Sequence, residues 1–285
     1  MAVDLGIDAG PASPPAPARP NTELWYTMFG VGHPQLKRYQ AFNRRLPADP
    51  RCKLCLAPFR APGSWLMLLQ RRTPSSKNPR FCSRCDIFLR KFPGGAEVET
   101  SIMFVDMRGS TGLAARMSPT EFSDVMHRFY AATFPVLNAC DGFILDVRGD
   151  GLLALFPPGF SGPDHAAKAL RAAHALTALR LTAADGTPLP FSVGLHTGVA
   201  YVGTMTGAEA GVEDVTVLGD AANVAARLCA AAPPGQAWVS EATGLAAGAA
   251  PGLDALMRVD IRGREQAVMA YAIAAGAGGA AAARP

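Results

Sequence analysis

The sequence predicts an α+β fold in which a central sheet carries helices and is preceded by a small metal-binding module. Three observations predict it. Apolar strand patterns alternate with helical patterns along the larger part of the chain, two pairs of strands are joined by tight glycine turns, and four cysteines ahead of them form two C-x-x-C pairs. Tight hairpins mixed with helices favour an antiparallel or mixed sheet over a doubly wound parallel one.

Length and composition bound the organisation of the chain. A chain of 285 residues, 49% of them apolar, can hold one sizeable domain and a smaller module. No apolar run approaches the roughly 18 residues that a transmembrane segment needs. The N-terminus carries Asp4 and Asp8 without a basic flank, so it is not a secretory signal. We therefore expect a cytoplasmic protein whose cysteines are metal ligands or free thiols rather than disulfides.

Changes in composition divide the chain into four parts. Residues 1–20 are dominated by Pro and Ala and residues 275–285 by Ala and Gly, so both are predicted to be disordered tails. Phe92-Pro93-Gly94-Gly95 has the composition of a linker. It separates a four-cysteine module at 21–93 from the main domain at 96–274.

The basic residues concentrate in the module. Between Leu36 and Phe92 there are 14 Lys and Arg but only two acids, which leaves 13 of the 27 basic and 21 of the 23 acidic residues for the rest of the chain. Such a module can bind an anionic partner, either nucleic acid or a membrane surface, or it can pack against the acidic body of its own chain. The sequence leaves these alternatives open.

The module is predicted to begin with an amphipathic helix from Asn21 to about Gln40. Its cysteines follow as two pairs separated by 26 residues: Cys52, Cys55, Cys82 and Cys85. Four thiolates at such spacing suit tetrahedral Zn²⁺ in a zinc-ribbon-like module, and neighbouring basic residues would offset the negative charge. An iron–sulfur cluster uses the same ligands and is the alternative. Cys140 and Cys229 have apolar helical neighbours and are interpreted as buried core thiols.

The main domain is predicted to begin with a strand at 98–106. Ser118-Pro119-Thr120-Glu121 is a capping box with a proline start, and it opens a helix that ends near Gly142. A second helix runs from about 164 to 183, and a hairpin turns around Gly198. The other expected elements are a hairpin at 143–156, a strand at 215–218, a helix at 221–231 and strands at 237–240, 257–261 and 267–274.

Two aspartates stand where apolar strands give way to glycine-containing turns. Asp106 follows the strand at 98–106, and Asp150 lies inside the tight hairpin. Asp beside Gly commonly caps a turn, but two carboxylates on neighbouring strand ends can also hold hard divalent cations together with substrate phosphates. The backbone amides after Asp106, in a turn before a helix, are suited to binding phosphate. Asn223 and Arg227 lie four residues apart and share one face of their helix.

Four motifs in order resemble the class III nucleotide cyclases, which form cyclic AMP or cyclic GMP from the triphosphate. They are VDMRGST at 105–111, RGDGLLALF at 148–156, VGLHTG at 193–198 and LGDAANVAARL at 218–228. The resemblance covers about 97–273. It implies a ferredoxin-like cyclase domain and two Mg²⁺ or Mn²⁺ ions per active site, held by Asp106 and Asp150. His196, within VGLHTG, is interpreted as structural.

The resemblance also assigns the substrate contacts. The segment after Asp106 would bind phosphates through Met107, Arg108, Gly109, Ser110 and Thr111. Asn223 would orient the ribose, Arg227 would stabilise charge on the reacting phosphate, and Arg264 would hold the terminal phosphates. In the family these groups come from two chains, so the resemblance implies a homodimer with composite active sites and an arm at 205–212 that reaches across.

Two positions of the family choose the purine. Adenylate cyclases usually have Lys four residues before the second metal Asp, where this chain has Asp146; the other position is Thr216. An Asp146 carboxylate suits the N1 and N2 donors of guanine, whereas Thr216 can also accept from N6 of adenine. Because bacterial members of this type mostly resemble adenylate cyclases, ATP is placed slightly ahead of GTP. A weakly active cyclase fold that serves a nucleic-acid- or membrane-binding metal module is the further alternative.

Overall fold

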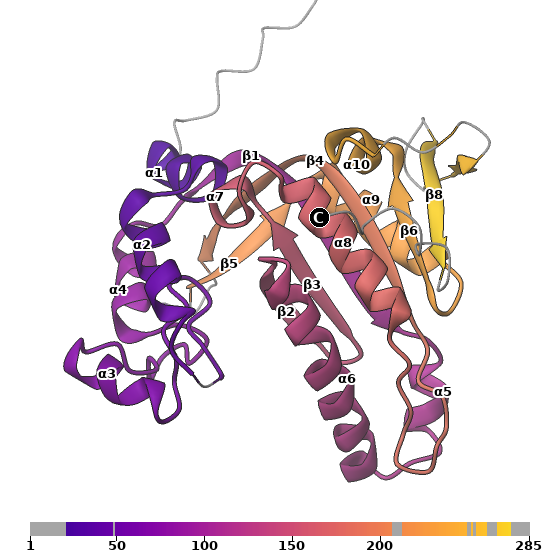
Figure 1. The fold of residues 1–285 in the computed structure, drawn as a ribbon, viewed down its shortest axis with the longest axis horizontal. Coiled ribbons are helices and arrows are strands. Elements are labelled where there is room, and N and C mark those ends of the chain that lie inside the picture. The colour runs from indigo at the N-terminus through magenta and orange to yellow at the C-terminus, as the bar shows by residue number, and fades with distance from the viewer. Residues whose placement is uncertain are drawn as a thin grey trace, which may run out of the picture.

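The computed structural model describes residues 21–47, 49–206, 213–249, 252, 255–260 and 267–274 (Figure 1). The predicted tails at 1–20 and 275–285 lie outside the described residues.

A mixed sheet of eight strands forms the centre of the described chain. Its order is β2-β3-β1-β4-β6-β8-β7, with β5 paired to β4 off this path. Only β4 and β6 run parallel; the other described pairs are antiparallel. The strands are β1 Gly95–Met107, β2 Phe143–Arg148, β3 Gly151–Phe156, β4 Phe191–Thr206, β5 Glu213–Leu218, β6 Gln236–Ser240, β7 Met257–Val259 and β8 Val268–Ala274. The predicted α+β class with a mixed sheet is confirmed.

Helices cover both faces of this sheet and build the module at one end of it (Figure 1). Those of the module are α1 Thr22–Tyr26, the π-helix η1 Thr27–Val31, α2 Pro34–Asn43, α3 Gly63–Leu69 and α4 Ser83–Lys91. Those of the main domain are α5 Ser110–Ala114, α6 Pro119–Ala139, α7 Pro158–Ser161, α8 His165–Ala178, α9 Asp220–Ala231 and α10 Glu241–Ala246.

The central strand β1 is buried on both faces of the sheet. Its successive side chains alternate between these faces. Val98 and Ile102 belong to a hydrophobic cluster shared with the module and α9. Met103 and Val105 belong to a second cluster, with residues of α6 and α8. Because side chains alternate along a strand, Asp106 falls on the same face as Ile102. The side of the sheet that faces the module and α9 therefore carries the first predicted metal ligand.

Local signals in the sequence set several boundaries correctly. The predicted capping box opens α6, with Ser118 Oγ accepting from the amide of Glu121 at 3.3 Å and the Glu121 carboxylate accepting from the amide of Ser118 at 2.8 Å. The β2–β3 hairpin is also confirmed. Its turn places Gly149 at a φ of 56°, a left-handed conformation that glycine adopts without steric cost.

Three expected elements are wrong in detail. The hairpin around Gly198 is one continuous strand, β4, because both halves pair with β1 and Gly198 lies opposite Thr100. The helix expected from 21 to 40 is divided at Gly32, whose φ of 100° ends η1 before Pro34 starts α2. The helix expected to reach 183 ends at Ala178, and the next residue is extended.

The module packs against the sheet instead of standing apart from it. Its Trp25 and Phe29 rings are stacked at 5.4 Å, and Phe29 lies edge-on to Phe143 of β2 at 5.8 Å. The Trp25 indole N–H donates to the carbonyl of Phe92 at 3.0 Å. Arg44 of the module forms an ion pair with Asp141 of the main domain. The basic module thus packs against the acidic main domain of its own chain, which is one of the alternatives that the sequence leaves open.

Candidate functional site

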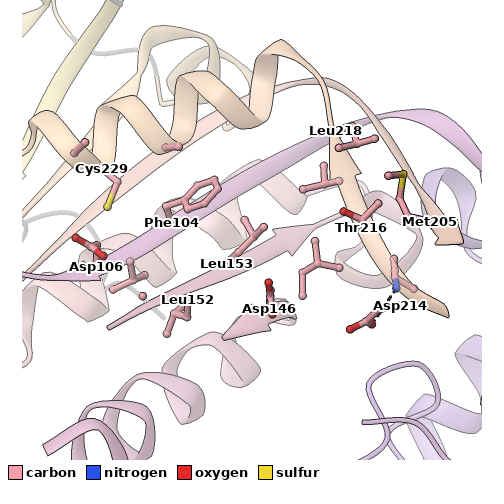
Figure 2. Close-up of a pocket in the computed structure, with 17 residues that line it drawn as sticks. Phe104, Asp106, Asp146, Leu152, Leu153, Met205, Asp214, Thr216, Leu218 and Cys229 are labelled. Atoms are coloured by element: carbon pink, nitrogen blue, oxygen red, sulfur yellow. Dashed lines mark hydrogen bonds between the residues drawn. The ribbon is translucent and has the colours of Figure 1, made fainter. Parts of the chain in front are cut away.

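A pocket of about 860 Å³ opens on the face of the sheet that carries α9. The five strands β1 to β5 and the helix α9 line it, and apolar side chains such as Phe104 and Leu153 form its middle (Figure 2). Asp106 lies at one end, and Asp146, Asp214 and Thr216 lie toward the other (Figure 2). Such a pocket combines an apolar wall for a flat ring with polar groups at both ends.

The two predicted metal ligands lie next to each other at the first end. Asp106 on β1 is opposite Gly151 in the β1–β3 register, directly after Asp150. The Met107 amide donates to the Asp150 carbonyl at 3.0 Å, and the Ser110 hydroxyl donates to the Asp150 carboxylate. Burial, and then the nearby Asp150 charge, raise the pKa of Asp106, against the opposing effect of Arg108. Two carboxylates that repel each other in this way suit a divalent cation.

The segment after Asp106 is only in part available to phosphate. The amides of Met107 and Arg108 donate to the protein carbonyls of Asp150 and Pro190. The Arg108 guanidinium donates to the Ser192 hydroxyl at 2.7 Å and to two carbonyls near the end of α9. Arg108 therefore ties β1 to α9 in this structure. Gly109, Ser110 and Thr111, at the start of α5, stay predicted as phosphate contacts.

Both predicted base-selecting residues line the second end of the pocket. Asp146 comes from β2 and Thr216 from β5, strands that are distant in sequence. Asp214, two residues before Thr216, also lines this end and was not predicted from the sequence. The period of two along a strand could have indicated it. The base end therefore holds two carboxylates and one hydroxyl.

Asn223 and Arg227 stand apart from this pocket. Both side chains are exposed on α9, whereas Ala226, Cys229 and Ala230 of the same helix line the pocket. The structure thus brings Asp106, Asp146 and Thr216 together but not the pair on α9. Arg264 lies outside the described residues, as does the part of the predicted arm at 207–212.

Cys229, Cys140 and His196, to which the sequence assigned structural roles, lie in the following surroundings. Cys229 is buried, lines the pocket and donates to the Ser192 carbonyl at 3.4 Å; burial, with the Asp106 charge next, raises its pKa to about 12. Cys140, at the end of α6, packs against the second hydrophobic cluster but is only half-buried, so the expectation that it is a buried thiol is wrong. His196 lies within β4, not in a turn, and its Nδ1 is 2.8 Å from the Ser240 hydroxyl.

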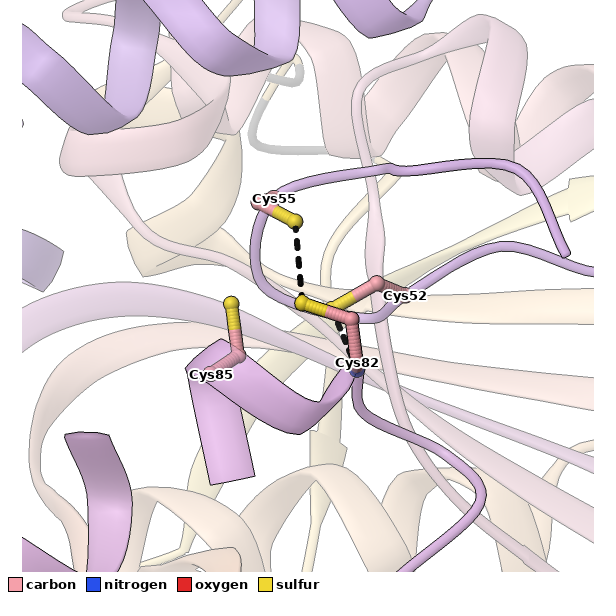
Figure 3. Close-up of side chains that lie close together, drawn as sticks. All are labelled: Cys52, Cys55, Cys82 and Cys85. Carbon is pink, nitrogen blue, oxygen red and sulfur yellow. Dashed lines mark hydrogen bonds between the residues drawn. The ribbon is translucent and has the colours of Figure 1, made fainter. Parts of the chain in front are cut away.

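The four cysteines of the two C-x-x-C pairs meet in one cluster (Figure 3). Their sulfur atoms all lie within 4.8 Å of one another, and the sulfurs of Cys55 and Cys82 are 3.7 Å apart. A disulfide needs about 2.05 Å, whereas a tetrahedron with metal–sulfur bonds of ~2.3 Å has an edge near 3.8 Å. The amide of Cys82 donates to Cys52 Sγ at 3.2 Å, an interaction that favours a thiolate. The cluster therefore fits a tetrahedral metal ion.

One buried cation accompanies the cluster. Arg72 is 5% exposed, and its Nη1 is 3.4 Å from Cys55 Sγ. Burial acts to lower the pKa of Arg72, but the charges of Cys55, Cys82 and Cys85 outweigh it and raise the pKa. A guanidinium buried beside thiols is favoured when the thiols are ionised, as they are in a metal site.

A family model for the adenylate and guanylate cyclase catalytic domain matches residues 96–275, more than half of the chain. The chain belongs to this cyclase family. The family assignment makes the main domain a lyase-type nucleotide cyclase domain, and cyclases of class III use Mg²⁺ or Mn²⁺. The match begins at the second residue of β1 and leaves the four-cysteine module outside.

Two curated relatives are named as adenylate cyclases. The chain is 32% identical over 133 residues to an adenylate cyclase of Anabaena cylindrica, covering 45% of this chain and 26% of the relative. It is 33% identical over 137 residues to adenylate cyclase 1 of Rhizobium meliloti, covering 46% of this chain and 20% of the relative. The chain thus spans about a quarter or less of the length of these relatives.

Solved cyclase structures share the fold. The guanylyl cyclase Cya2 superposes with a TM-score of 0.58 at 26% identity, over 64% of this chain and 94% of that one. The adenylyl cyclase CyaB from P. aeruginosa superposes with a TM-score of 0.52 at 22% identity, over 62% of this chain and 94% of that one. Among the described residues, no helix combines the length and apolar character that crossing a bilayer requires.

Proposed function

We propose that the protein is a purine nucleotide cyclase that converts ATP to 3′,5′-cyclic AMP and pyrophosphate. The observation that carries this proposal is the order of the side chains along the pocket. Adjacent aspartates, Asp106 and Asp150, mark one end, base-selecting groups mark the other, and an apolar wall lies between them. This order matches a triphosphate–ribose–purine substrate laid along the sheet.

The carboxylates of Asp106 and Asp150 would hold two Mg²⁺ or Mn²⁺ ions. Bound there, the ions lower the pKa of the ribose 3′-hydroxyl and neutralise the leaving phosphates. The Ser110 hydroxyl orients the Asp150 carboxylate by its hydrogen bond. The amides at the start of α5 would receive phosphate oxygens.

The proposal includes a homodimer in which each site is composite. Asn223 and Arg227 are exposed on α9 and do not reach the pocket of their own chain. A second copy related by a two-fold axis would bring them to the pocket twice, once for each site. There Asn223 would orient the ribose and Arg227 would stabilise charge on the reacting phosphate. Arg264 would hold the terminal phosphates.

GTP is the second candidate substrate, and one observation favours it. Asp146 lines the base end of the pocket as an acceptor, at the position where adenylate cyclases usually have Lys. The names of the two curated relatives support ATP instead. Mass-spectrometric analysis of the products from ATP and from GTP, with Mg²⁺ or Mn²⁺, distinguishes the two.

That experiment also tests the proposed reaction itself. The Asp106→Ala chain, purified in the same way, controls for a contaminating cyclase. We expect cyclic AMP and pyrophosphate in equal amounts from the natural chain and neither from the variant. A natural chain that forms neither cyclic nucleotide with either metal would overturn the proposed function.

The four-cysteine cluster is proposed to hold one Zn²⁺ per chain through Cys52, Cys55, Cys82 and Cys85. Its sulfur spacing and the buried Arg72 support this assignment. Elemental analysis of the purified protein should give about one zinc per chain. If the analysis finds iron and acid-labile sulfide instead, the cluster is an iron–sulfur cluster and the zinc assignment is wrong.

A second function, binding to an anionic membrane surface, is favoured by the outer end of the module. The helix α3 exposes Trp65 and Leu69 at 65% and 83%, and exposed Arg60 and Arg71 flank it. No acidic residue occurs between Asp49 and Asp86. Apolar side chains with a basic border suit the headgroup region of anionic lipid.

Sedimentation with phosphatidylcholine vesicles, with and without phosphatidylserine, tests this second function. We expect binding to the anionic vesicles that is lost when Trp65 and Leu69 are both replaced by Ser. Leu245→Ser, an exposed leucine on α10, is the matched control and should bind as the natural chain does. No binding to anionic vesicles contradicts the proposal. Self-association that the double replacement abolishes would assign α3 to a second copy.

A further inference from the structure

The edge strand β2 is irregular at the point where it presents the base-selecting residue. Ile144 pairs with Ala154 and Asp146 pairs with Leu153, so Leu145 is an extra residue in β2. Such a bulge disrupts the ladder locally and redirects the side chains around it. Leu145 and Asp146 both line the pocket although they are consecutive. The orientation of Asp146 therefore depends on what holds this bulge.

Two cations of the four-cysteine module contact the bulge. Lys53 Nζ donates to the Leu145 carbonyl at 2.5 Å. Arg80 Nη1 donates to Asp214 Oδ2 at 2.7 Å and lies 3.4 Å from Asp146 Oδ1. The same Asp146 oxygen accepts from the Val147 amide at 2.9 Å. One guanidinium thus bridges the two carboxylates at the base end of the pocket.

The cysteine cluster holds these two cations in place. Lys53 directly follows Cys52, and Arg80 is two residues before Cys82. The Lys53 amide donates to the Arg80 carbonyl at 3.1 Å, and the Cys82 amide donates to Cys52 Sγ at 3.2 Å. A metal that joins Cys52 to Cys82 would therefore restrain the backbone from which both cations extend.

We propose that Arg80 is a positioning residue that, by holding and neutralising Asp146, sets the purine preference toward ATP. This inference rests on the proposed cyclase function. Asp146 and Asp214 without a cation would accept from the N1 and N2 donors of guanine and would disfavour the acceptor N1 of adenine. With Arg80 between them, their charge is offset. The module thus supplies the positive charge that a lysine supplies in adenylate cyclases.

The test compares kcat/KM for ATP and GTP in the full chain and in Arg80 variants. In Arg80→Ala the ATP-to-GTP ratio should fall by about tenfold or more, since Asp146 and Asp214 both lose their ion pair with the guanidinium. Arg80→Lys keeps the charge and should retain most of the ratio. Lys77→Ala is the matched control from the same loop. Its side chain is exposed and makes no ion pair within the described part of the chain, so the ratio should not move.

A double-mutant cycle shows whether Arg80 acts through Asp146. In an Asp146→Asn background, Arg80→Ala should change the ratio by less than it does in the natural chain, because one of the two carboxylates that Arg80 neutralises is gone and Asp214 remains. A merely structural role would lower both activities in either background. A shift that is as large in Asp146→Asn as in the natural chain, or a ratio that Arg80→Ala leaves unchanged, would overturn the proposal. Zinc content and melting temperature establish that each variant has folded.

A binding measurement separates failure of this inference from failure of the proposed function. The 3′-deoxy forms of ATP and GTP lack the attacking hydroxyl, so calorimetry reports their affinities whether or not the chain turns over. Arg80→Ala should lower the affinity for 3′-deoxy-ATP relative to 3′-deoxy-GTP by about tenfold. If the natural chain is active but Arg80→Ala leaves the relative affinities unchanged, only the role of Arg80 is refuted and the proposed function stands. An inactive natural chain refutes the reaction, and the affinities still decide the role of Arg80.

Discussion

Gly194 of β4 is the position at which a single methyl group is expected to separate α9 from the sheet. A Cβ built on Gly194 would lie 2.1 Å from the backbone nitrogen of Cys229 and 2.2 Å from the carbonyl oxygen of Ala225. Both atoms belong to the backbone of α9, so no side-chain rotation relieves the contact. Reaching an ordinary contact of 3.4 Å requires a shift of more than about 1 Å.

Gly194→Ala is therefore expected to cost stability and activity together. Overpacking of this kind lowers the free energy of unfolding by about 1–3 kcal/mol. For a domain of this size the melting temperature should fall by about 2–12 °C. Because α9 carries Asn223 and Arg227 and lines the pocket through Cys229, a shift of 1 Å should also reduce kcat on the order of 10- to 100-fold.

Circular dichroism melting and cyclase turnover, measured on the same preparation, check this expectation. Gly112→Ala on α5 is the stability control, since its Cβ would meet no atom of the described chain within 4 Å. Its melting temperature should be equal or slightly higher, as Ala favours a helix over Gly. A Gly194→Ala chain that melts within about 1 °C of the natural one and keeps its turnover would refute the packing of α9 on β4.

Three further predictions concern the proposed site. Asp106→Ala or Asp150→Ala should abolish cyclisation while gel filtration still shows the dimer, because both carboxylates hold the cations; unchanged turnover in either refutes the two-metal assignment. Asp106→Ala and Arg227→Ala chains, each inactive, should recover about a quarter of natural activity when mixed equally, since half the dimers gain one intact site; no recovery despite proven subunit exchange argues against composite sites. The raised pKa of Asp106 means that the folded, metal-free chain binds protons more readily than the unfolded one, so this group's contribution to stability falls as pH rises through the carboxyl range. Mn²⁺ at pH 7 should reverse this loss and raise the melting temperature of the natural chain but not of Asp106→Asn, as differential scanning fluorimetry would show.

Short-range signals predicted the elements that depend on neighbouring residues. The capping box at Ser118 opens α6, the Gly149 turn joins β2 to β3, and the C-x-x-C pairs assemble into one cluster. The capping box and the glycine turn depend on the backbone preferences of a few neighbouring residues. The cysteine cluster depends on the short spacing within each C-x-x-C pair and on the tetrahedral arrangement that four thiols favour. The strand ending at Asp106 was predicted for the same reason, because its apolar run and the following glycine are local.

Elements that depend on distant partners were predicted less well. Gly198 looks like a turn from its own neighbours, but β1 offers ladder partners to both halves of β4 and keeps the strand continuous. Asp214 lacked a motif of its own and became a pocket residue only through the placement of β5 beside the site.

By itself the sequence determined the fold class, the paired carboxylates, the four-cysteine cluster and the two residues proposed to choose the base. Only the tertiary structure decided that the module packs on the pocket side of the sheet and that Arg80 meets Asp146 and Asp214 there. Arg80 is separated from Asp146 by 66 positions and from Asp214 by 134 positions along the chain, so no local signal indicates that contact. It arises because the apolar face of β1 and β2 must be buried, and the module buries it together with α9.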